Sequence, residues 1–188
     1  MTDRHASGEP DEGKLLERAR DGDRDALESL VLRHQGVVYR FLLGFLKDEE
    51  RAADAAQETF LKAVVRLEDF RGDSAFRTWL LAIARNEALG MIRQTGRRRE
   101  ESLEDAGFLL DGGEPPDTRA VRAEEVRRVR KALERLPEKQ RLSVSLRLFD
   151  GLSFREVGEA IGSSEGAARV NYHYGIGRLR EWLDAEQE

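Results

Sequence analysis

The sequence predicts an all-α protein made of two small helical domains joined by a flexible linker, the second domain containing a helix-turn-helix. Apolar residues recur at three- and four-residue steps along most of the chain, which is the period of an amphipathic helix. An acidic stretch at 100–118, with paired glycines and paired prolines, interrupts that period as a linker would. We therefore expect a disordered N-terminus at 1–11 and helical domains at 12–99 and 119–188.

Composition narrows the class of protein. Of 188 residues, 39% are hydrophobic and 37% are charged, which is typical of small soluble helical domains. Cysteine is absent, so disulfides, thiolate catalysis and zinc–thiolate sites are excluded. No apolar run approaches the roughly 18 residues of a membrane span, and the polar N-terminus does not resemble a signal peptide. We expect a cytoplasmic protein without membrane insertion, whose net charge of −5 does not suggest a simple nucleic-acid binder.

Two helices are predicted before residue 47, at about 14–20 and 25–46. Asp23 is a suitable N-cap for the second, because its carboxylate can accept hydrogen bonds from free amides of the first turn. His34 lies on the apolar face of this helix, where a core position is more common than a functional one. The predicted core face consists of Leu27, Leu30, Val31, His34, Val38, Phe41, Leu42 and Phe45.

The next helix, within 51–67, carries two stripes. The apolar one is predicted to face the core and consists of Ala53, Ala56, Phe60, Val64 and Leu67. About 100° round the helix lies a second stripe of Asp54, Glu58, Leu61 and Val65, bordered by Gln57. Such a helix either packs on a core with one face and on a partner with the other, or is buried on both sides by its own domain.

A turn at 70–74 leads into a further helix, for which Asp73 or Ser74 is the predicted N-cap. Its apolar face is Phe76, Leu80, Ala84, Ala88, Met91 and Ile92. Another side carries Trp79, Ala82, Asn86, Leu89 and Arg93, followed by the arginines at 97–99. An aromatic ring, an amide and arginines in one line suit stacking on bases and contact with phosphates, although tryptophan is also a common core residue.

The strings DAAQETF at 54–60 and FRGDSAFRTWL at 70–80 resemble region 2 of bacterial extracytoplasmic-function (ECF) sigma factors. The resemblance implies that Asp54, Gln57, Glu58 and Phe60 contact the clamp helices of RNA polymerase core, and we add Leu61 and Val65 from the second stripe. It also implies that the turn and following helix open and read the minus-ten promoter element. Our candidates there are Phe70, Arg71, Ser74, Arg77, Trp79, Asn86 and Arg93. Gly90 and Ala56 depart from residues that are common in the family.

The second domain begins with a helix from 119 to about 135, whose inward residues are Val121, Val126, Val129, Ala132, Leu133 and Leu136. Pro137 suits the start of the next helix, at about 138–149, and Gly151 suits a left-handed turn after it. Ser153 and Glu156 have the spacing of a capping box. Gly162 then separates this short helix from a longer one that ends near 183, which is the layout of a helix-turn-helix.

On the last helix, the residues predicted to face the core are Ala168, Tyr172, Ile176, Leu179 and Leu183. The candidate groove contacts are Ser163, Ser164, Gly166, Arg169, Val170 and His173, with Ser163 or Ser164 also the N-cap. A packed helical corner gives a similar pattern. Gly175 and Gly177 lie inside the helix, each at a cost of about 1 kcal/mol relative to alanine.

The string at 136–170 resembles region 4 of the same family, which reads the minus-thirty-five element and docks on the polymerase flap. Together the two resemblances imply a sigma factor that directs promoter-specific initiation, with RNA polymerase core, promoter DNA and an anti-sigma factor as partners. The alternative is a stand-alone helix-turn-helix regulator with an N-terminal sensing or interaction domain, and a pure interaction scaffold is a third possibility. We expect no enzyme, cofactor or metal site, because the sequence has no phosphate-binding loop, catalytic constellation or metal-spaced cluster.

Overall fold

A computed structural model describes residues 11–96 and 127–185, and these two ranges contain helices and no strand. The first range holds α1 (Glu12–Arg20), α2 (Arg24–Leu46), α3 (Glu49–Val65), the 3₁₀ turn η1 (Leu67–Asp69) and α4 (Phe76–Gly96). The second holds a helical segment at 127–135, then α6 (Glu138–Leu148), α7 (Phe154–Ile161) and α8 (Glu165–Ala185). We call the first range the N-unit and the second the C-unit. The predicted all-α class is confirmed. Of the stretch 1–11 that was predicted to be disordered, Asp11 is ordered, because it is the N-cap of α1. Residues 1–10, the linker, Arg97–Arg99, Val121 and Val126 lie outside the described residues.

Most helix boundaries follow from capping side chains. The Asp23 carboxylate accepts from the amides of Asp25 and Ala26 and so begins α2 as predicted. The capping box of Ser153 and Glu156 is present at α7. The predicted cap of α4 is wrong by one or two residues, because Ala75, whose carbonyl accepts from Thr78 and Trp79, precedes the first helical residue. Pro137 occupies the N-cap position of α6, which begins at Glu138 as predicted.

The orientation of α3 differs from the predicted one. Its buried residues are Ala52, Ala55, Thr59 and Ala63, all of them small. The predicted core stripe lies one residue step away: Ala53 and Val64 are exposed, and Ala56 and Phe60 are only partly buried. Small side chains let the α3 backbone approach α2 and α4 closely. The large apolar residues of α3 therefore point away from the core, and only Leu67, in η1, is buried as predicted.

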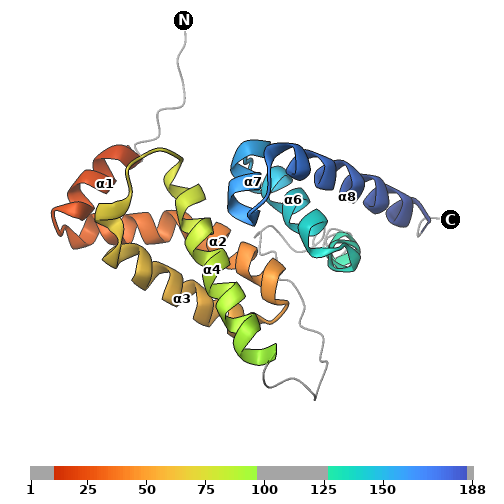
Figure 1. Cartoon of the computed structure of the whole chain (residues 1–188), viewed down its shortest axis with the longest axis horizontal. Coiled ribbons are helices and arrows are strands. Elements are labelled where there is room, and N and C mark those ends of the chain that lie inside the picture. Colours follow the sequence, from red (N-terminus) through yellow and green to blue (C-terminus); the bar gives the residue numbers. More distant parts are fainter. Residues whose placement is uncertain (1–10, 97–126, 186–188) are drawn as a thin grey trace, which may run out of the picture.

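The N-unit and the C-unit pack directly on one another through α4 against α7 and α2 against α6 (Figure 1). One cluster of buried apolar residues runs through both units and includes Phe41, Leu42 and Leu80 from the first and Leu146 and Ile161 from the second. A smaller second cluster lies within the C-unit, between the 127–135 segment, α6 and α8. The two units thus share a core in this state.

The predicted core faces of α2, α4 and α8 are largely confirmed, because their apolar stripes are buried or partly buried. Ile92 is the exception on α4 and is exposed. The structure also explains Gly175, which sequence reading could not: a Cβ there would lie 2.7 Å from Cγ2 of the buried Val144 on α6. Gly177 faces open space, and nothing in the structure explains it.

Candidate protein and nucleic-acid interfaces

An open apolar groove of about 830 Å³ runs between α2 and α3 of the N-unit. The outward side chains of α3 form one wall and a stripe of α2 forms the other. The lining residues are Val31, Gln35, Gly36, Tyr39, Ala53, Ala56, Gln57, Phe60, Leu61 and Val64. A groove lined mainly by carbon, on a surface that otherwise carries charge, is the kind of site that takes an apolar helix or loop of another protein.

The second stripe of α3 is exposed, as predicted for a partner-binding face. Leu61 is 63% exposed and Val65 is 83% exposed, next to the groove. Asp54 and Gln57 are also exposed, and the Glu58 carboxylate forms an ion pair with Lys62 Nζ at 3.3 Å. Apolar side chains at the centre with charged and amide groups beside them match the anatomy of protein interfaces.

The turn before α4 is organised by three aromatic rings. Phe70 is only 7% exposed, and its ring packs against Phe76 and Trp79 with centroids 5.3 and 5.4 Å apart. Arg20 of α1 donates to the Phe70 carbonyl and fixes the turn from the other side. The structure therefore places Phe70 in the core, where it cannot stack on a base in this state. Trp79 is partly exposed and stacks on Phe76.

Other candidate minus-ten residues are divided between solvent and the C-unit. Arg71, Asn86 and Arg93 are exposed, and Ser74 is half-buried. Trp79, Asn86 and Arg93 follow one another at seven-residue steps, so they lie along one side of α4. Arg77, by contrast, points into the contact between the two units.

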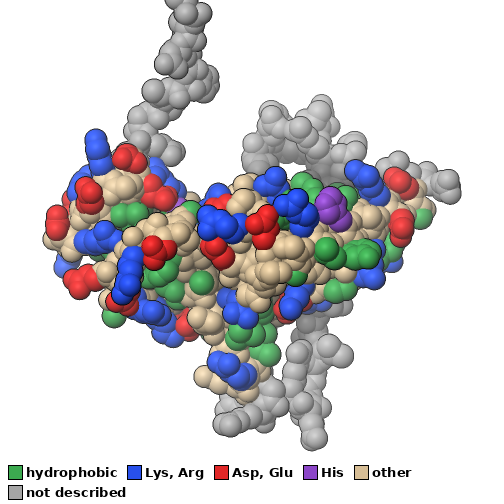
Figure 2. Space-filling view, turned by 45° about the horizontal axis from the view of Figure 1, so that its top comes forward, with side chains coloured by type: hydrophobic (Ala, Val, Ile, Leu, Met, Phe, Trp, Pro, Cys, Tyr) green, Lys and Arg blue, Asp and Glu red, His purple; other side chains and the backbone are tan. Residues whose placement is uncertain are grey.

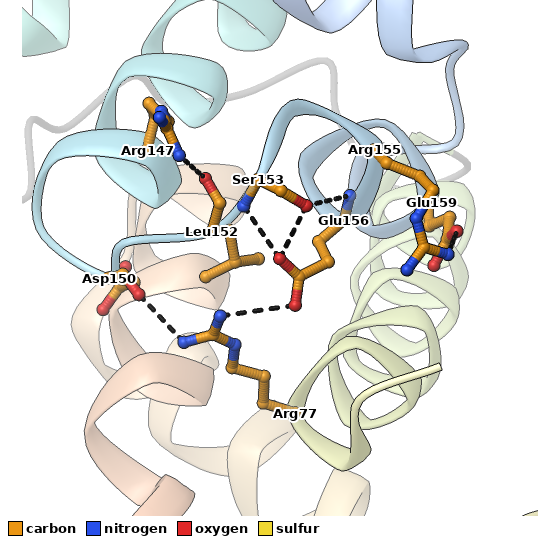
Figure 3. A network of polar contacts seen from close by, with 8 residues as sticks. All are labelled: Arg77, Arg147, Asp150, Leu152, Ser153, Arg155, Glu156 and Glu159. Carbon is orange, nitrogen blue, oxygen red and sulfur yellow. Dashed lines mark hydrogen bonds and ion pairs between the residues drawn. The ribbon is translucent and has the colours of Figure 1, made fainter. Parts of the chain in front are cut away.

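Arg77 joins α4 to the start of α7 (Figure 3). Its Nη1 donates to the Asp150 carbonyl at 3.0 Å and its Nη2 to Glu156 Oε1 at 3.3 Å. The other oxygen of Glu156 accepts from the amide and hydroxyl of Ser153, closing the capping box. Burial alone would raise the pKa of Glu156, but the hydrogen bonds from Ser153 and Arg77 outweigh it and lower the pKa. One carboxylate therefore caps a helix and binds the other unit.

Two further arginines cross between the units. Arg40 of α2 forms an ion pair with Asp150, whose side chain is only 5% exposed. Burial raises the pKa of Asp150, against the opposing effect of Arg40. Arg141 of α6 is buried and donates to the carbonyl of Gly44, near the end of α2, from Nε at 3.0 Å and Nη2 at 2.6 Å. A cation that satisfies carbonyls at a helix C-terminus also interacts favourably with the helix dipole. None of these links was predicted.

The helix-turn-helix is confirmed as α7, a turn at 162–164 and α8. Gly162 has a left-handed φ of 65°, and Ser164 Oγ accepts from the Ala167 amide as the cap of α8. Gly158 is required by the tight turn, because a Cβ there would lie 2.9 Å from the Ser163 carbonyl oxygen. The Arg85 side chain of α4 lies against Gly162, so the turn also contacts the N-unit.

The outward face of α8 is exposed as predicted at Gly166, Arg169, Val170 and His173. Arg169 is held in place by Glu165 at 2.9 Å, and its guanidinium lies 5.0 Å from the Phe154 ring centroid. Sequence reading missed Tyr174, which is 66% exposed beside Val170. On the face in Figure 2, basic and acidic side chains are interspersed, and no large patch of one sign is visible.

Within residues 11–96 and 127–185, no three histidine or acidic side chains are grouped to hold a metal ion. The helices in these ranges include none with the length and hydropathy needed to cross a bilayer. The described residues therefore form several candidate binding surfaces on a helical scaffold: the α2–α3 groove, the exposed side of α4 and the outward face of α8.

Comparison with known proteins agrees with the sequence resemblance. Residues 30–98 match the family description Sigma-70 region 2, and residues 132–181 match Sigma-70, region 4. The chain is 37% identical to the RNA polymerase sigma-H factor of Pseudomonas aeruginosa, over 91% of both chains. It is 35% identical to the ECF RNA polymerase sigma-E factor of Escherichia coli strain K12, over 90% of this chain and 91% of that one.

Solved structures show the same likeness. The structure of CnrH in complex with the cytosolic domain of CnrY is 28% identical, with a TM-score of 0.64 over 92% of this chain and 96% of that one. The sigma factor RpoE of Bartonella quintana, solved with the anti-sigma factor NepR, is 22% identical with a TM-score of 0.69, over 84% and 96% of the two chains. The latter likeness concerns the fold.

Proposed function

The chain belongs to the extracytoplasmic-function family of bacterial sigma factors, and from this premise we propose how its surfaces divide the work of transcription initiation. It binds RNA polymerase core and directs it to promoters. We assign residues 12–99 to region 2, 100–118 to the acidic linker and 119–188 to region 4. Its action consists of binding and strand separation, without a catalytic residue or cofactor of its own.

The groove between α2 and α3 is the proposed docking site for the polymerase clamp helices. The observation that carries this assignment is that α3 turns its small residues inward and its large ones, Phe60, Leu61 and Val64, toward an open groove. Exposed apolar residues of this size cost solubility unless a partner covers them. Asp54, Gln57 and Glu58 lie beside the groove, where they can orient the partner, and Val65 extends the contact.

The start of α4 and its exposed side are the proposed minus-ten reader. Trp79 offers a ring to an unpaired base, Asn86 offers hydrogen bonds, and Arg71 and Arg93 offer charge to phosphates. Phe70 supports this site from beneath by packing on Trp79, and Ser74 lies in the turn between them. Arg77 belongs to the same surface once it is free of the C-unit.

The exposed face of α8 is the proposed minus-thirty-five reader, entering the major groove with its first turns. Ser163 and Ser164 lie at the helix N-terminus, where hydroxyls and free amides suit a phosphate. Arg169 is positioned for a guanine or phosphate, while Val170 suits a thymine methyl group and His173 lies one turn further along. Few charges on this face imply that polymerase supplies part of the binding energy.

Two finer points complete the proposal. The solved relative CnrH is bound by the cytosolic domain of CnrY and RpoE by the anti-sigma factor NepR, so we infer an anti-sigma partner for this chain as well. We also infer that the chain acts in the cytoplasm, where polymerase meets the chromosome. A stand-alone regulator is disfavoured, because a sensing domain would not match region 2 over residues 30–98.

The test of this proposal is a measurement of core binding by Leu61→Glu. Leu61 is mostly exposed, so the variant should keep the thermal stability of the wild type. Loss of an interface hot spot of about 2 kcal/mol would raise the Kd for core about 30-fold. Leu32→Glu, at a similarly exposed position of α2 that does not line the groove, is the matched control and should bind within about twofold of wild type. Unchanged binding by Leu61→Glu would show that the groove is not the docking site.

A further inference from the structure

Two large apolar side chains lie exposed and side by side on the outward face of α8. Val170 and Tyr174 are both more than half exposed. They are four residues apart, so they are neighbours on the helix surface and lie about 6 Å apart along its axis. The rest of this face is mostly polar. The pair forms a small apolar patch within the proposed minus-thirty-five reader, and no contact inside the chain requires it to be there.

The arginine of this face is held away from the patch. Arg169 is the only arginine among residues 166–177. Its Nη2 donates to Glu165 Oε1 at 2.9 Å, and its guanidinium lies 5.0 Å from the centroid of the Phe154 ring on α7. The His173 ring lies on the same side, with its centroid 6.4 Å from that of Phe154. The outward face of α8 is thus divided into a charged edge beside α7 and an apolar edge.

The charged edge has the chemistry of a phosphate contact. The Phe154 ring also carries the guanidinium of Arg147, 5.1 Å from its centroid, so two exposed arginines share one ring beside α8. Cations fixed next to a helix that enters the groove suit the phosphates that border it. A phosphate contact carries no direct sequence information, because phosphates are alike at every base pair. Other side chains on this face must then read the sequence.

The apolar edge has the chemistry to recognise thymine. Of the four bases, only thymine presents a methyl group in the major groove, where apolar side chains contact it. The axial separation of Val170 and Tyr174, about 6 Å, is close to the rise of two base pairs, about 7 Å. The two side chains can therefore meet the methyl groups of thymines about one or two base pairs apart. The Tyr174 hydroxyl can still bond to water or to a base edge when its ring is covered.

We propose that Val170 and Tyr174 determine the sequence of the minus-thirty-five element by contacting the methyl groups of two nearby thymines, while Arg169 contacts the phosphate backbone. This inference rests on the proposed function of α8 and adds Tyr174 to it as a specificity-determining residue. The preferred element contains two thymines, about one or two base pairs apart, whose methyl groups contribute to binding. It does not depend on a guanine opposite Arg169.

Deoxyuridine in place of thymine tests these contacts, because it removes one methyl group and keeps the base pair. Promoters are first identified by sequencing the transcripts that core polymerase and this chain make on genomic DNA. The Kd of the holoenzyme is then measured on one such promoter, with each thymine of the minus-thirty-five element replaced in turn. Loss of one covered methyl group should raise the Kd about fourfold at two positions and by less than about 1.5-fold at the others.

Matched variants assign each methyl group to a side chain. In the Tyr174→Ala holoenzyme, deoxyuridine at one of the two positions should have no further effect, while the other position keeps its effect. Val170→Ala should show the reverse, so each variant is the control for the other. Tyr174→Phe keeps the ring and should keep both effects. These variants should leave the salt slope unchanged, whereas Arg169→Ala should lower it by about one unit. Because both side chains are exposed, the variants should melt at the wild-type temperature.

A minus-thirty-five element without thymine overturns the proposal. So does a promoter on which no deoxyuridine weakens binding, or on which its effects are the same for the wild type, Tyr174→Ala and Val170→Ala. The apolar patch would then face a protein partner or solvent. The absence of any promoter-specific transcript would instead refute the proposed function. Specific transcripts with unchanged deoxyuridine effects refute only the role of Val170 and Tyr174, so the two failures are distinguishable.

Discussion

The helices α3 and α8 both have one buried and one exposed face, but they distribute large apolar residues in opposite ways. On α3 the buried stripe is made of alanines and a threonine, while Phe60, Leu61 and Val64 line an open groove. On α8 the larger residues Tyr172, Ile176 and Leu179 pack inward, and the outward face is mostly polar. Large apolar residues on the outward face suit a protein partner, and a mostly polar outward face suits DNA. The period of the hydrophobic residues alone does not distinguish these two kinds of surface.

The largest effect is expected from breaking the small inner stripe of α3. Ala55 is fully buried, so Ala55→Leu would force extra volume between α3 and its neighbours and lower the free energy of unfolding by about 3 kcal/mol. The matched control is Ala53→Leu, two residues away on the exposed side, which should change stability by less than about 0.5 kcal/mol. Denaturant unfolding followed by circular dichroism measures both, and a larger loss from Ala53→Leu than from Ala55→Leu would show that α3 is oriented as the sequence predicts.

A smaller effect is expected inside α8, where two glycines with different surroundings form a natural pair. Gly175→Ala would push a methyl group against Val144 and destabilise the chain by about 2 kcal/mol. Gly177→Ala meets only open space and should stabilise it by up to about 1 kcal/mol. Combining Gly175→Ala with Val144→Ala should cost less than the sum of the two single changes. Additive costs in thermal unfolding would exclude the contact.

The outward face of α8 is tested by Arg169→Ala in the holoenzyme. Loss of a base or phosphate contact should weaken promoter binding by about 1–2 kcal/mol and, if the contact is to phosphate, lower the salt slope by about one unit. Arg178 lies on the opposite side of the same helix, bonded to Gln140 on α6, so Arg178→Ala should leave the slope unchanged. Filter binding at several salt concentrations compares the two. An equal response from both arginines would contradict the assigned face.

The smallest effect concerns His34, a buried group between α1, α2 and α4. Burial lowers its pKa, although Glu12 Oε2 lies 3.0 Å from Nε2 and acts in the opposite direction. The unfolded chain, with a histidine pKa of about 6.5, then binds the proton more readily than the folded one. Stability is thus full above about pH 6.5 and falls as the pH drops below it. Replacing His34 by Gln should make the melting temperature less sensitive to pH between 7.5 and 5.5, and an unchanged pH dependence would refute this role.

The sequence predicts the helices well because local chemistry decides them. Asp23, the Ser153–Glu156 box and Gly162 act within a few residues of themselves, so their roles can be read without tertiary information. The orientation of α3 could not be read in this way, because a hydrophobic pattern does not distinguish a core from a groove that awaits a partner. The exposure of the outward residues of α8 was predicted because the inner stripe of this helix is made of larger apolar residues.

Contacts between residues distant in sequence are the part that the sequence did not predict. In the sequence Arg40 and Asp150 look like ordinary surface charges and Arg77 looks like a DNA contact; their mutual contacts form only when α2, α4 and the α6–α7 turn are brought together. Gly175 is explained only by Val144, 31 positions earlier and on another helix. Phe70 is buried because the rings of Phe76 and Trp79 pack against it. The turn residues around Phe70 in the sequence do not indicate this packing.

The apolar cluster that crosses between the units has a consequence for how the chain melts. Two domains with separate cores unfold independently and give two transitions, whereas Leu42 and Leu146 belong to one cluster here. Neither unit can lose its packing without exposing the other. In a calorimeter, the intact chain should therefore absorb heat in a single peak, with equal calorimetric and van't Hoff enthalpies. The cooperative unit of folding is then the pair of regions, although each region reads its own stretch of DNA.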